Sequence, residues 1–354
     1  MTNAAQIETR KADHIDIVLN KNVAAKGVTT GFERYFFQHN ALPELDLDQI
    51  DTALSLFGKE LKAPLLISSM TGGADPTRAI NLHLAEAAEQ LGIAMGVGSQ
   101  RAAIEAGHLT DTYRVRRVAP NLLLFANLGA VQLNYGYGVA HARQAVEMIE
   151  ADALFLHFNP LQEAVQAEGD RNWKEVLNKI ESLAKSLSVP IVAKEVGNGL
   201  GPVTARRLVD VGVKGIDVAG AGGTSWSEVE AHRQPNPLRK RIAHTFASWG
   251  TPTALALQLA RAALPPSIPI FASGGIRSGV DVAKAIALGA TLVGSAAPLL
   301  GPAIDGTEAV YNKFHSYLEE LRIAMFCAGA GSLAQLKQAP LRRVDNWELV
   351  HRTF

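Results

Sequence analysis

Eight short apolar runs recur along the chain at a spacing of about one strand plus one helix, and this repeat constrains the fold most. Parallel strands covered on both faces read as continuous runs of Val, Ile, Leu and Ala, and each needs a long, usually helical, crossover. The pattern therefore predicts an α/β fold of the (β/α)8 type, a TIM barrel. The runs span residues 64–70, 94–100, 122–129, 153–160, 190–197, 215–223, 268–275 and 292–298.

Nearly every run carries a glycine, serine, asparagine or charged residue at or near its end. In a barrel of this type the catalytic groups lie at the carboxyl ends of the strands, where the following loops meet. We therefore expect the functional residues at the ends of these runs.

The chain has 354 residues, of which 47% are hydrophobic, and its formal net charge is +0, so nothing in its charge favours nucleic acid as a partner. A barrel commonly takes about 250 residues. We expect an N-terminal extension over residues 1–60 that packs on or over the barrel mouth, followed by the barrel over 61–354.

Neither export nor a membrane span is predicted. The single cysteine, Cys327, cannot form an intramolecular disulfide, and we interpret it as a small buried apolar residue. The first twenty residues carry charges throughout and lack the apolar region of a signal peptide, so we expect a cytoplasmic protein. Residues 285–304 are uncharged over a spanning length, but glycines and prolines interrupt them.

Helical periodicity between the runs predicts helices over residues 76–91, 172–187 and 280–288. Residues 224–250 fall outside this rhythm and contain two prolines and a run of three basic residues. A long structureless connection after the sixth strand would be a lid or mobile loop, and the alternative is a solvated loop without a role.

Glycine-rich loops follow the seventh and eighth runs, at residues 273–277 and 294–297. Barrels of this type often bind a phosphate there, at backbone N–H groups and a helix N-terminus. Glycine lets the backbone approach the phosphate oxygens, and Arg277 would add a charged donor. The alternative is that these glycines only form tight turns.

The other strand ends favour a flavin as the phosphate ligand. Residues 69–73, Ser99 and Asn127 offer neutral polar groups suited to the edge of a planar ring. Lys194 lies inside an apolar run and needs an anionic partner, because burying an unpaired charge is costly. A reduced flavin, negative near N1 and the C2 carbonyl, would supply it. A purely structural partner, Glu195 or Asp217, is the alternative.

One carboxylate and several cationic residues are also expected at the carboxyl end of the barrel. Glu163 follows the fourth run, and Mg²⁺ is usually held by one or two carboxylates together with water and substrate phosphate. Arg10, Lys11, His14 and Arg101 would bind a strongly anionic small molecule, although the Arg10-Lys11 pair also reads as a solvated terminus. The motifs of a dinucleotide domain, a P-loop and a zinc site are absent.

These motifs together resemble the type II isopentenyl diphosphate isomerases, which are flavoenzymes with a (β/α)8 fold. The resemblance rests on the order and spacing of RKADH (10–14), SMTGG (69–73), GSQR (98–101), HFNPLQE (157–163), AKEVGNG (193–199), AGAGGTSW (219–226) and SGGIRSG (273–279). It implies a redox-neutral interconversion of isopentenyl diphosphate and dimethylallyl diphosphate, with reduced FMN, Mg²⁺ and NADPH as reductant. It also implies a homo-oligomer, a tetramer or octamer.

The resemblance further implies roles for individual residues. FMN would be held by Ser69, Met70, Thr71, Ser99, Asn127, Lys194, Thr224, Gly275, Ile276, Arg277, Ser295 and Ala296. The substrate would contact Arg10, Lys11, Ser99, Gln100, Arg101 and Gln162, and Glu163 would bind Mg²⁺. Gln162, His157 and Lys194 are the residues predicted to take part in the chemistry.

Two other functions compete with the isomerase. A flavin barrel with net redox chemistry, such as a 2-hydroxy acid oxidase, would share the fold. An inosine monophosphate dehydrogenase-like enzyme needs a nucleophilic cysteine on a catalytic loop, whereas Cys327 lies beyond the eighth run. A non-catalytic flavin- or phosphate-binding protein would also keep the barrel, since fold does not determine function.

Overall fold

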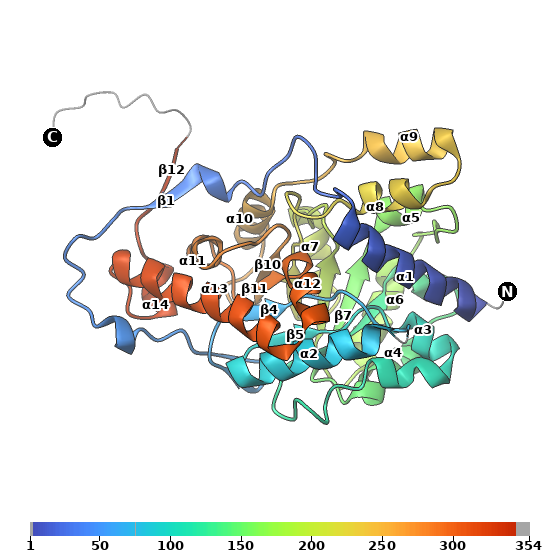
Figure 1. Ribbon diagram of the computed structural model, residues 1–354, viewed down its shortest axis with the longest axis horizontal. Coiled ribbons are helices and arrows are strands. Elements are labelled where there is room, and N and C mark those ends of the chain that lie inside the picture. The colour runs from blue at the N-terminus through green and yellow to red at the C-terminus, as the bar shows by residue number, and fades with distance from the viewer. Residues whose placement is uncertain (1–2, 75, 345–354) are drawn as a thin grey trace.

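The computed structural model describes residues 3–74 and 76–344, and its centre is a closed barrel of eight parallel strands (Figure 1). Each strand lies within one of the eight predicted runs, so the predicted fold is confirmed. Pairing of the last strand with the first closes the sheet. In order around the barrel, the strands are β4 (Leu65–Ile67), β5 (Ala94–Gly96), β6 (Leu124–Gly129), β7 (Ala153–Phe158), β8 (Ile191–Glu195), β9 (Gly215–Asp217), β10 (Ile270–Ser273) and β11 (Leu292–Ser295).

Helices surround the barrel, and the predicted ones are present. Helix α2 (Pro76–Leu91) has the predicted bounds, and α11 (Gly279–Ala287) differs by one residue at each end. Helix α6 (Val176–Ser186) begins later than predicted, since Glu175 before it adopts a left-handed backbone with φ of 58°. The other outer helices are α3 (Arg101–Glu105), α4 (Val139–Ile149), α5 (Pro160–Val165), α7 (Pro202–Asp210), α10 (Thr253–Ala263), α12 (Ala297–Asp305), α13 (Thr307–Cys327) and α14 (Leu333–Leu336).

Side chains from alternate positions fill the barrel interior. Phe125 stacks on Phe155 with ring centroids 4.3 Å apart, and Phe271 meets both rings edge to face. A hairpin of β2 (Leu54–Leu56) and β3 (Lys59–Leu61) packs against the same cluster and covers this end of the barrel. A ligand must therefore enter from the opposite end, where the strands have their carboxyl termini.

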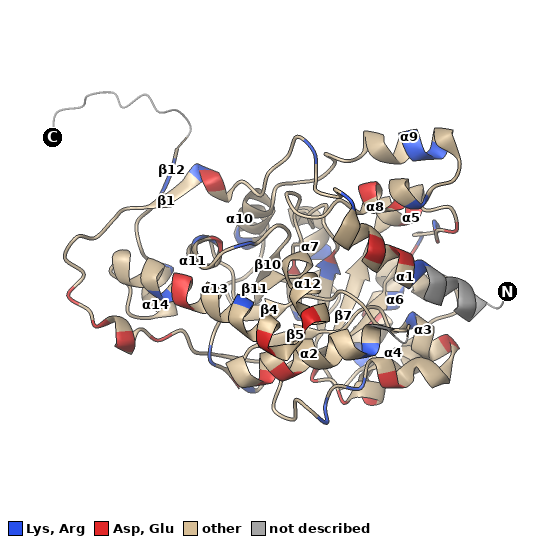
Figure 2. Cartoon of the chain, viewed as in Figure 1, with Lys and Arg blue, Asp and Glu red and all other residues tan. Residues whose placement is uncertain are grey.

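The N-terminal extension reaches that opposite end. Helix α1 (Asn3–Asn20) contacts α3, α12 and α8 (Trp226–Arg233), and Figure 1 shows it crossing the barrel. Further along the extension, β1 (Tyr35–Phe37) pairs antiparallel with β12 (Leu341–Arg343) near the end of the chain. Basic and acidic residues are interspersed on α13, whereas on α1 Arg10 and Lys11 precede Asp13 and Asp16 (Figure 2).

The prediction of a structureless segment over residues 224–250 is wrong. The segment forms α8 and, after a short turn, α9 (Pro237–Thr245). Pro237 does not break a helix because it occupies the first turn, where its missing N–H has no helical partner. Asn236 caps that helix by accepting a hydrogen bond from the Arg239 N–H. Pro237, which was expected to lie in a loop, therefore begins helix α9.

Two remaining expectations concern the membrane and the cysteine. Among residues 3–74 and 76–344, no helix is long and apolar enough to cross a membrane. Residues 285–304 form the end of α11, β11 and most of α12. Cys327 ends α13 and is half-buried rather than fully buried.

We predict that Phe155→Ala destabilises the fold by about 3–5 kcal/mol, since it removes a fully buried ring and leaves a cavity beside Phe125. Urea denaturation followed by circular dichroism measures the change. Leu42→Ala serves as the control, because Leu42 is 73% exposed. Equal effects of the two substitutions would contradict the assignment of Phe155 to the core.

Candidate active site

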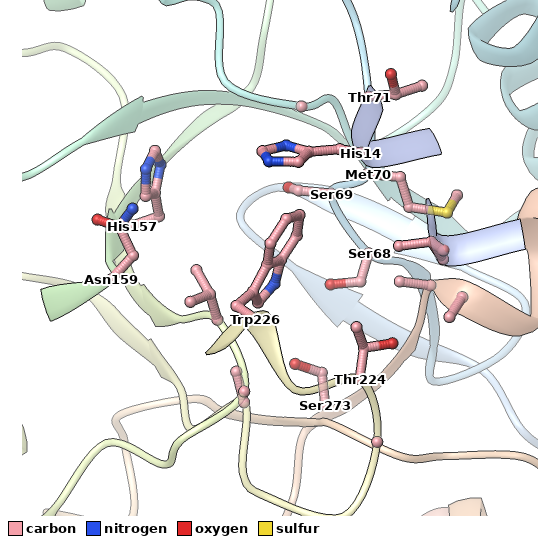
Figure 3. A pocket seen from close by; sticks show the side chains of 18 of the residues that line it. His14, Ser68, Ser69, Met70, Thr71, His157, Asn159, Thr224, Trp226 and Ser273 are labelled. Carbon is pink, nitrogen blue, oxygen red and sulfur yellow. The ribbon is translucent and has the colours of Figure 1, made fainter. Parts of the chain in front are cut away.

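A cavity opens at the carboxyl ends of the barrel strands, beneath α1 and α8 (Figure 3). It is lined by residues at or just beyond the ends of the barrel strands and by the side chains of α1 that face the barrel. Most residues predicted from the sequence line it: Arg10, Lys11, Ser69, Met70, Thr71, Ser99, Arg101, Asn127, His157, Gln162, Glu163, Lys194, Thr224, Gly275, Ile276, Arg277, Ser295 and Ala296.

Gln100 is the predicted residue that does not line this cavity, and its side chain is fully buried elsewhere. Its amide nitrogen donates to the Ala145 carbonyl at 2.8 Å, and its amide oxygen accepts from the Asn127 N–H at 2.8 Å. These bonds tie α4 to β6. The side chain of Gln100 therefore supports the strand that carries Asn127 rather than facing a ligand.

The loops after β10 and β11 form a glycine cradle, and at the contact of the β10 loop with the loop after β9 only glycine fits. A Cβ at Gly274 would lie 2.1 Å from the Gly220 carbonyl oxygen, and one at Gly223 would lie 2.5 Å from the Gly275 nitrogen. Gly274 and Gly275 also have φ of 101° and 76°, in the region that favours glycine. The Ser295 hydroxyl donates to the Ile276 carbonyl at 3.0 Å and joins the two loops. Residues 274–277 and 294–297 line the cavity beside the start of α12, where a helix N-terminus suits a phosphate.

Two buried polar atoms on the cavity wall lack a partner. The Ser69 hydroxyl and the Asn159 amide oxygen have no hydrogen-bond partner among the described residues. Both residues line the cavity, and Figure 3 shows them on different walls. An unpartnered buried polar group is costly, so each position suits a ligand with hydrogen-bonding groups. Together with the glycine cradle, they fit a phosphorylated ring system.

Lys194 has the anionic neighbour that its position in an apolar strand required. Its ammonium group lies 2.8 Å from the Asp217 carboxylate and 3.2 Å from the Ser273 hydroxyl. The Ser273 hydroxyl in turn donates to the other Asp217 oxygen at 2.7 Å. Asp217 is the structural partner considered from the sequence, yet Lys194 also lines the cavity. The lysine can contact a ligand while Asp217 holds it in place.

His157 is held as a neutral imidazole. Its Nδ1 lies 2.8 Å from the Asn127 amide oxygen, which can only accept, so this nitrogen carries the proton. Burial, with repulsion from Lys194 and Lys11, lowers the pKa of His157 to about 4. At neutral pH its Nε2 therefore carries a lone pair on the cavity wall.

Two hydrogen bonds, one to each oxygen, hold the Glu163 carboxylate in the orientation that a metal ligand needs. The Asn159 amide donates to one carboxylate oxygen at 3.0 Å, and the Asp170 N–H donates to the other at 2.7 Å. Burial raises the pKa of Glu163 against the opposing effect of these hydrogen bonds. Within the part of the chain that the structure describes, no three His, Cys, Asp or Glu side chains gather around a possible metal site. A metal at Glu163 would need water and ligand oxygens to complete its shell.

The predicted cations gather beside Glu163, contrary to the alternative of a solvated terminus for Arg10 and Lys11. The Lys11 ammonium donates to the carbonyls of Gly72 and Ser99 and to the Tyr113 hydroxyl. Burial and the charge of Arg10 lower the pKa of Lys11 to about 7. An anion bound here would favour the protonated form.

Sequence reasoning missed a buried carboxylate on α8. Glu230 accepts hydrogen bonds from Gln162 at 3.1 Å and Arg233 at 2.8 Å, and lies 3.0 Å from His14 Nε2. Burial alone would raise the pKa of Glu230, but these partners outweigh it and lower the pKa to about 2. Trp226, on the same helix, lies edge to face with His14 in the middle of the cavity (Figure 3). Trp226 and Glu230 are four residues apart, a spacing that would have indicated one face of a helix. The two prolines that follow favoured a loop instead.

The chain is similar to proteins of known family. A family model described as FMN-dependent dehydrogenase matches residues 4–107 and 134–343. An isopentenyl-diphosphate delta-isomerase of Synechocystis sp. is 60% identical over 94% of this chain and 95% of its own. One of Stutzerimonas stutzeri is 59% identical over 95% and 97%.

The chain belongs to the isopentenyl-diphosphate delta-isomerase family. The resemblance seen in the motifs is thereby confirmed. Among solved structures, a mandelate oxidase variant superimposes with a TM-score of 0.64 at 18% identity, covering 97% of this chain and 100% of the oxidase. A further structure of mandelate oxidase gives a TM-score of 0.61 at 18% identity, covering 97% of this chain and 99% of the oxidase. At this identity the likeness shows the barrel fold alone, so the isomerase family shares its scaffold with oxidases.

We predict that Lys11 makes anion binding pH-dependent. Because the pKa of Lys11 is lowered to about 7, its charged form declines above that pH and binding of inorganic pyrophosphate should weaken. The affinity ratio of wild type to Lys11→Met should fall roughly tenfold between pH 6 and 8, and the ratio cancels the titration of the ligand itself. Isothermal titration calorimetry measures both affinities.

The matched control is Lys185→Met, which removes a lysine whose side chain is 71% exposed and pairs only with Glu181. Its affinity ratio to wild type should stay flat across the same pH range. A ratio for Lys11→Met that is equally flat would show that Lys11 keeps its charge or does not contact the anion.

Proposed function

We propose that this chain interconverts isopentenyl diphosphate and dimethylallyl diphosphate, using reduced FMN and Mg²⁺. One observation carries the proposal: the cavity lining contains two regions whose residues suit an anion. The glycine cradle after β10 and β11 suits the phosphate of a flavin. The rim of Arg10, Lys11, Arg101 and Glu163 suits a second, more highly charged ligand with a metal ion.

FMN would be held by its phosphate and by the edge of its ring. Backbone N–H groups of Gly275, Ile276 and Ala296 would bind the phosphate with the Arg277 side chain, and the Ser69 hydroxyl would gain the partner it lacks. Lys194 would face the N1 and C2 carbonyl edge, where a positive charge stabilises the reduced ring. When bound, reduced FMN supplies an electron-rich face and proton-transfer capacity beside the alkene.

The diphosphate would lie under α1. Arg10 and Arg101 would offer charged donors to its oxygens, and Glu163 would bind Mg²⁺. Lys11 would add positive charge, since its three N–H donors already bind Gly72, Ser99 and Tyr113. These contacts are remote from the reacting carbons, so they hold the five-carbon chain in place while it reacts. Ser99 and Gln162 line the cavity between the two ends of that substrate.

The remaining residues would control protons and water. Protonating an alkene develops positive charge on carbon, so the site should exclude water and other nucleophiles. Glu230 stays ionised and accepts from Gln162 Nε2, while the Asn159 amide donates to Gln162 Oε1 at 3.1 Å. The amide of Gln162 is thereby oriented. Trp226 adds an apolar wall, and Nε2 of His157 can accept a proton within the cavity.

Three further points follow from the family resemblance and stay predictions. NADPH would reduce the flavin before catalysis, although no net redox change occurs. The chain would act in the cytoplasm as a homo-oligomer, a tetramer or octamer. Its partner would be the diphosphate substrate, without a role for nucleic acid or a membrane.

The function is tested by anaerobic incubation of the dithionite-reduced, FMN-loaded protein with isopentenyl diphosphate and Mg²⁺. We expect dimethylallyl diphosphate to form while the flavin absorbance spectrum stays that of the reduced state. A 2-hydroxy acid oxidase would instead oxidise its substrate and consume oxygen in equal amounts. Failure to form dimethylallyl diphosphate would refute the isomerase, and unchanged substrate with tight FMN binding would indicate a non-catalytic flavoprotein.

We further propose that α1 and the segment 224–250 close over the substrate. Removal of residues 1–14 should lower kcat/KM by roughly 100-fold or more, because it removes the charged groups of Arg10 and Lys11, which would each contribute about 1.5–3 kcal/mol. The FMN content and melting temperature of the truncated protein serve as controls, since the FMN-binding loops lie elsewhere. Unchanged kcat/KM would contradict a role for α1.

A further inference from the structure

The loop between α5 and α6 joins the predicted metal ligand to one of the predicted diphosphate-binding arginines. Asp170 in this loop contacts both. Its backbone N–H donates to Glu163 Oε2 at 2.7 Å, and its carboxylate lies 2.7 Å from Arg101 Nη1. No function derived above uses Asp170.

The backbone of this loop is fitted closely against Glu163. A Cβ at Gly169 would lie 1.9 Å from the Glu163 carbonyl oxygen, so no side chain fits at that position. The Asp170 N–H follows directly and reaches the Glu163 carboxylate. The direction of that carboxylate thus depends on where the loop lies.

The carboxylate of Asp170 is fixed from the other side. Its Oδ2 accepts from Arg101 and from the Gln132 amide at 3.2 Å. Its side chain is 16% exposed and that of Arg101 is 21% exposed, so the pair is mostly shielded from water. A carboxylate that is shielded from water and accepts two hydrogen bonds orients its arginine better than a carboxylate in an exposed ion pair does.

The loop itself is held from outside the cavity. The Tyr135 hydroxyl accepts from the N–H groups of Arg171 and Asn172, each at 3.0 Å. The Arg171 guanidinium donates back to the Gln166 carbonyl at 2.8 Å. Asp170 is consequently a fixed point and not a mobile surface residue.

We propose that Asp170 is a positioning residue that sets Arg101 and Glu163 at the separation needed for one diphosphate to contact the guanidinium and the Mg²⁺ together. The inference rests on the proposed function. It extends that function to a residue that touches neither substrate nor metal. The competing role would be the opposite one, in which Asp170 neutralises Arg101 and weakens anion binding.

The test compares Asp170→Ala and Asp170→Asn in the FMN-loaded protein. Calorimetry measures inorganic pyrophosphate binding at fixed Mg²⁺, and then the Mg²⁺ affinity at fixed pyrophosphate. Asp170→Ala should weaken both, pyrophosphate by roughly tenfold, because Arg101 keeps Glu105 on its Nε but loses the partner of its Nη1. Asp170→Asn keeps an oxygen for Arg101 and the backbone N–H for Glu163, so it should stay within about threefold of wild type.

Coupling to the two target residues gives a second readout. The effect of Asp170→Ala should be largely lost when Arg101 is already alanine, because residues that act through one another are not additive. The isomerase KM should rise more than kcat falls. The FMN dissociation constant and melting temperature should not change. Asp48→Ala is the matched control, since Asp48 lies near Arg322 but is 96% exposed.

The outcomes distinguish failure of the Asp170 positioning role from failure of the isomerase function. If wild-type protein binds no pyrophosphate with Mg²⁺ and forms no dimethylallyl diphosphate, the proposed function fails. If wild type does both and Asp170→Ala binds pyrophosphate equally well or more tightly, the positioning role is overturned. Should the alanine variant fold poorly, Asp170→Ser carries the same expectation, because its hydroxyl is too short to reach Arg101.

Discussion

Pairing of β11 with β4 is the interaction on which the rest of the structure depends, because it closes the sheet. In a closed parallel barrel all eight carboxyl ends point to the same side, so residues far apart in sequence surround one cavity. Ser69, Lys194 and Ser295 reach that cavity from three different strand ends for this reason alone. The aromatic cluster of Phe125, Phe155 and Phe271 fills the opposite half and leaves only one end open to a ligand.

The cavity stabilises charge through paired groups. Lys194 has Asp217, Glu230 has Arg233 and His14, and Glu163 has the Asp170 N–H. Removing one partner of such a buried pair costs more than the pair itself contributes. These pairs therefore preorganise the charges of the cavity before a ligand binds, and the His14–Glu230 pair links α1 to α8.

Much of this arrangement was predictable from the sequence, and the failures have physical causes. Each barrel strand is buried on both faces and therefore has a continuous apolar sequence. The strands and the residues at their ends could be located from these apolar runs. Gln100 was misplaced because a residue next to a ligand-binding serine can point either way, and only the fold shows that it packs on α4. Glu230 was missed since its role comes from contacts with His14 and Gln162, which are distant in sequence. Pro237 was misread because proline ends helices and also begins them.

The pairing of β1 with β12 has a consequence for how the protein is made. Tyr35 lies opposite Arg343, so a segment synthesised before the barrel finds its partner in one synthesised after it. Contacts of such long sequence separation form late, after the local helices and neighbouring strands. A nascent chain interrupted before β12 would hold all eight barrel strands and still lack this junction between its two ends.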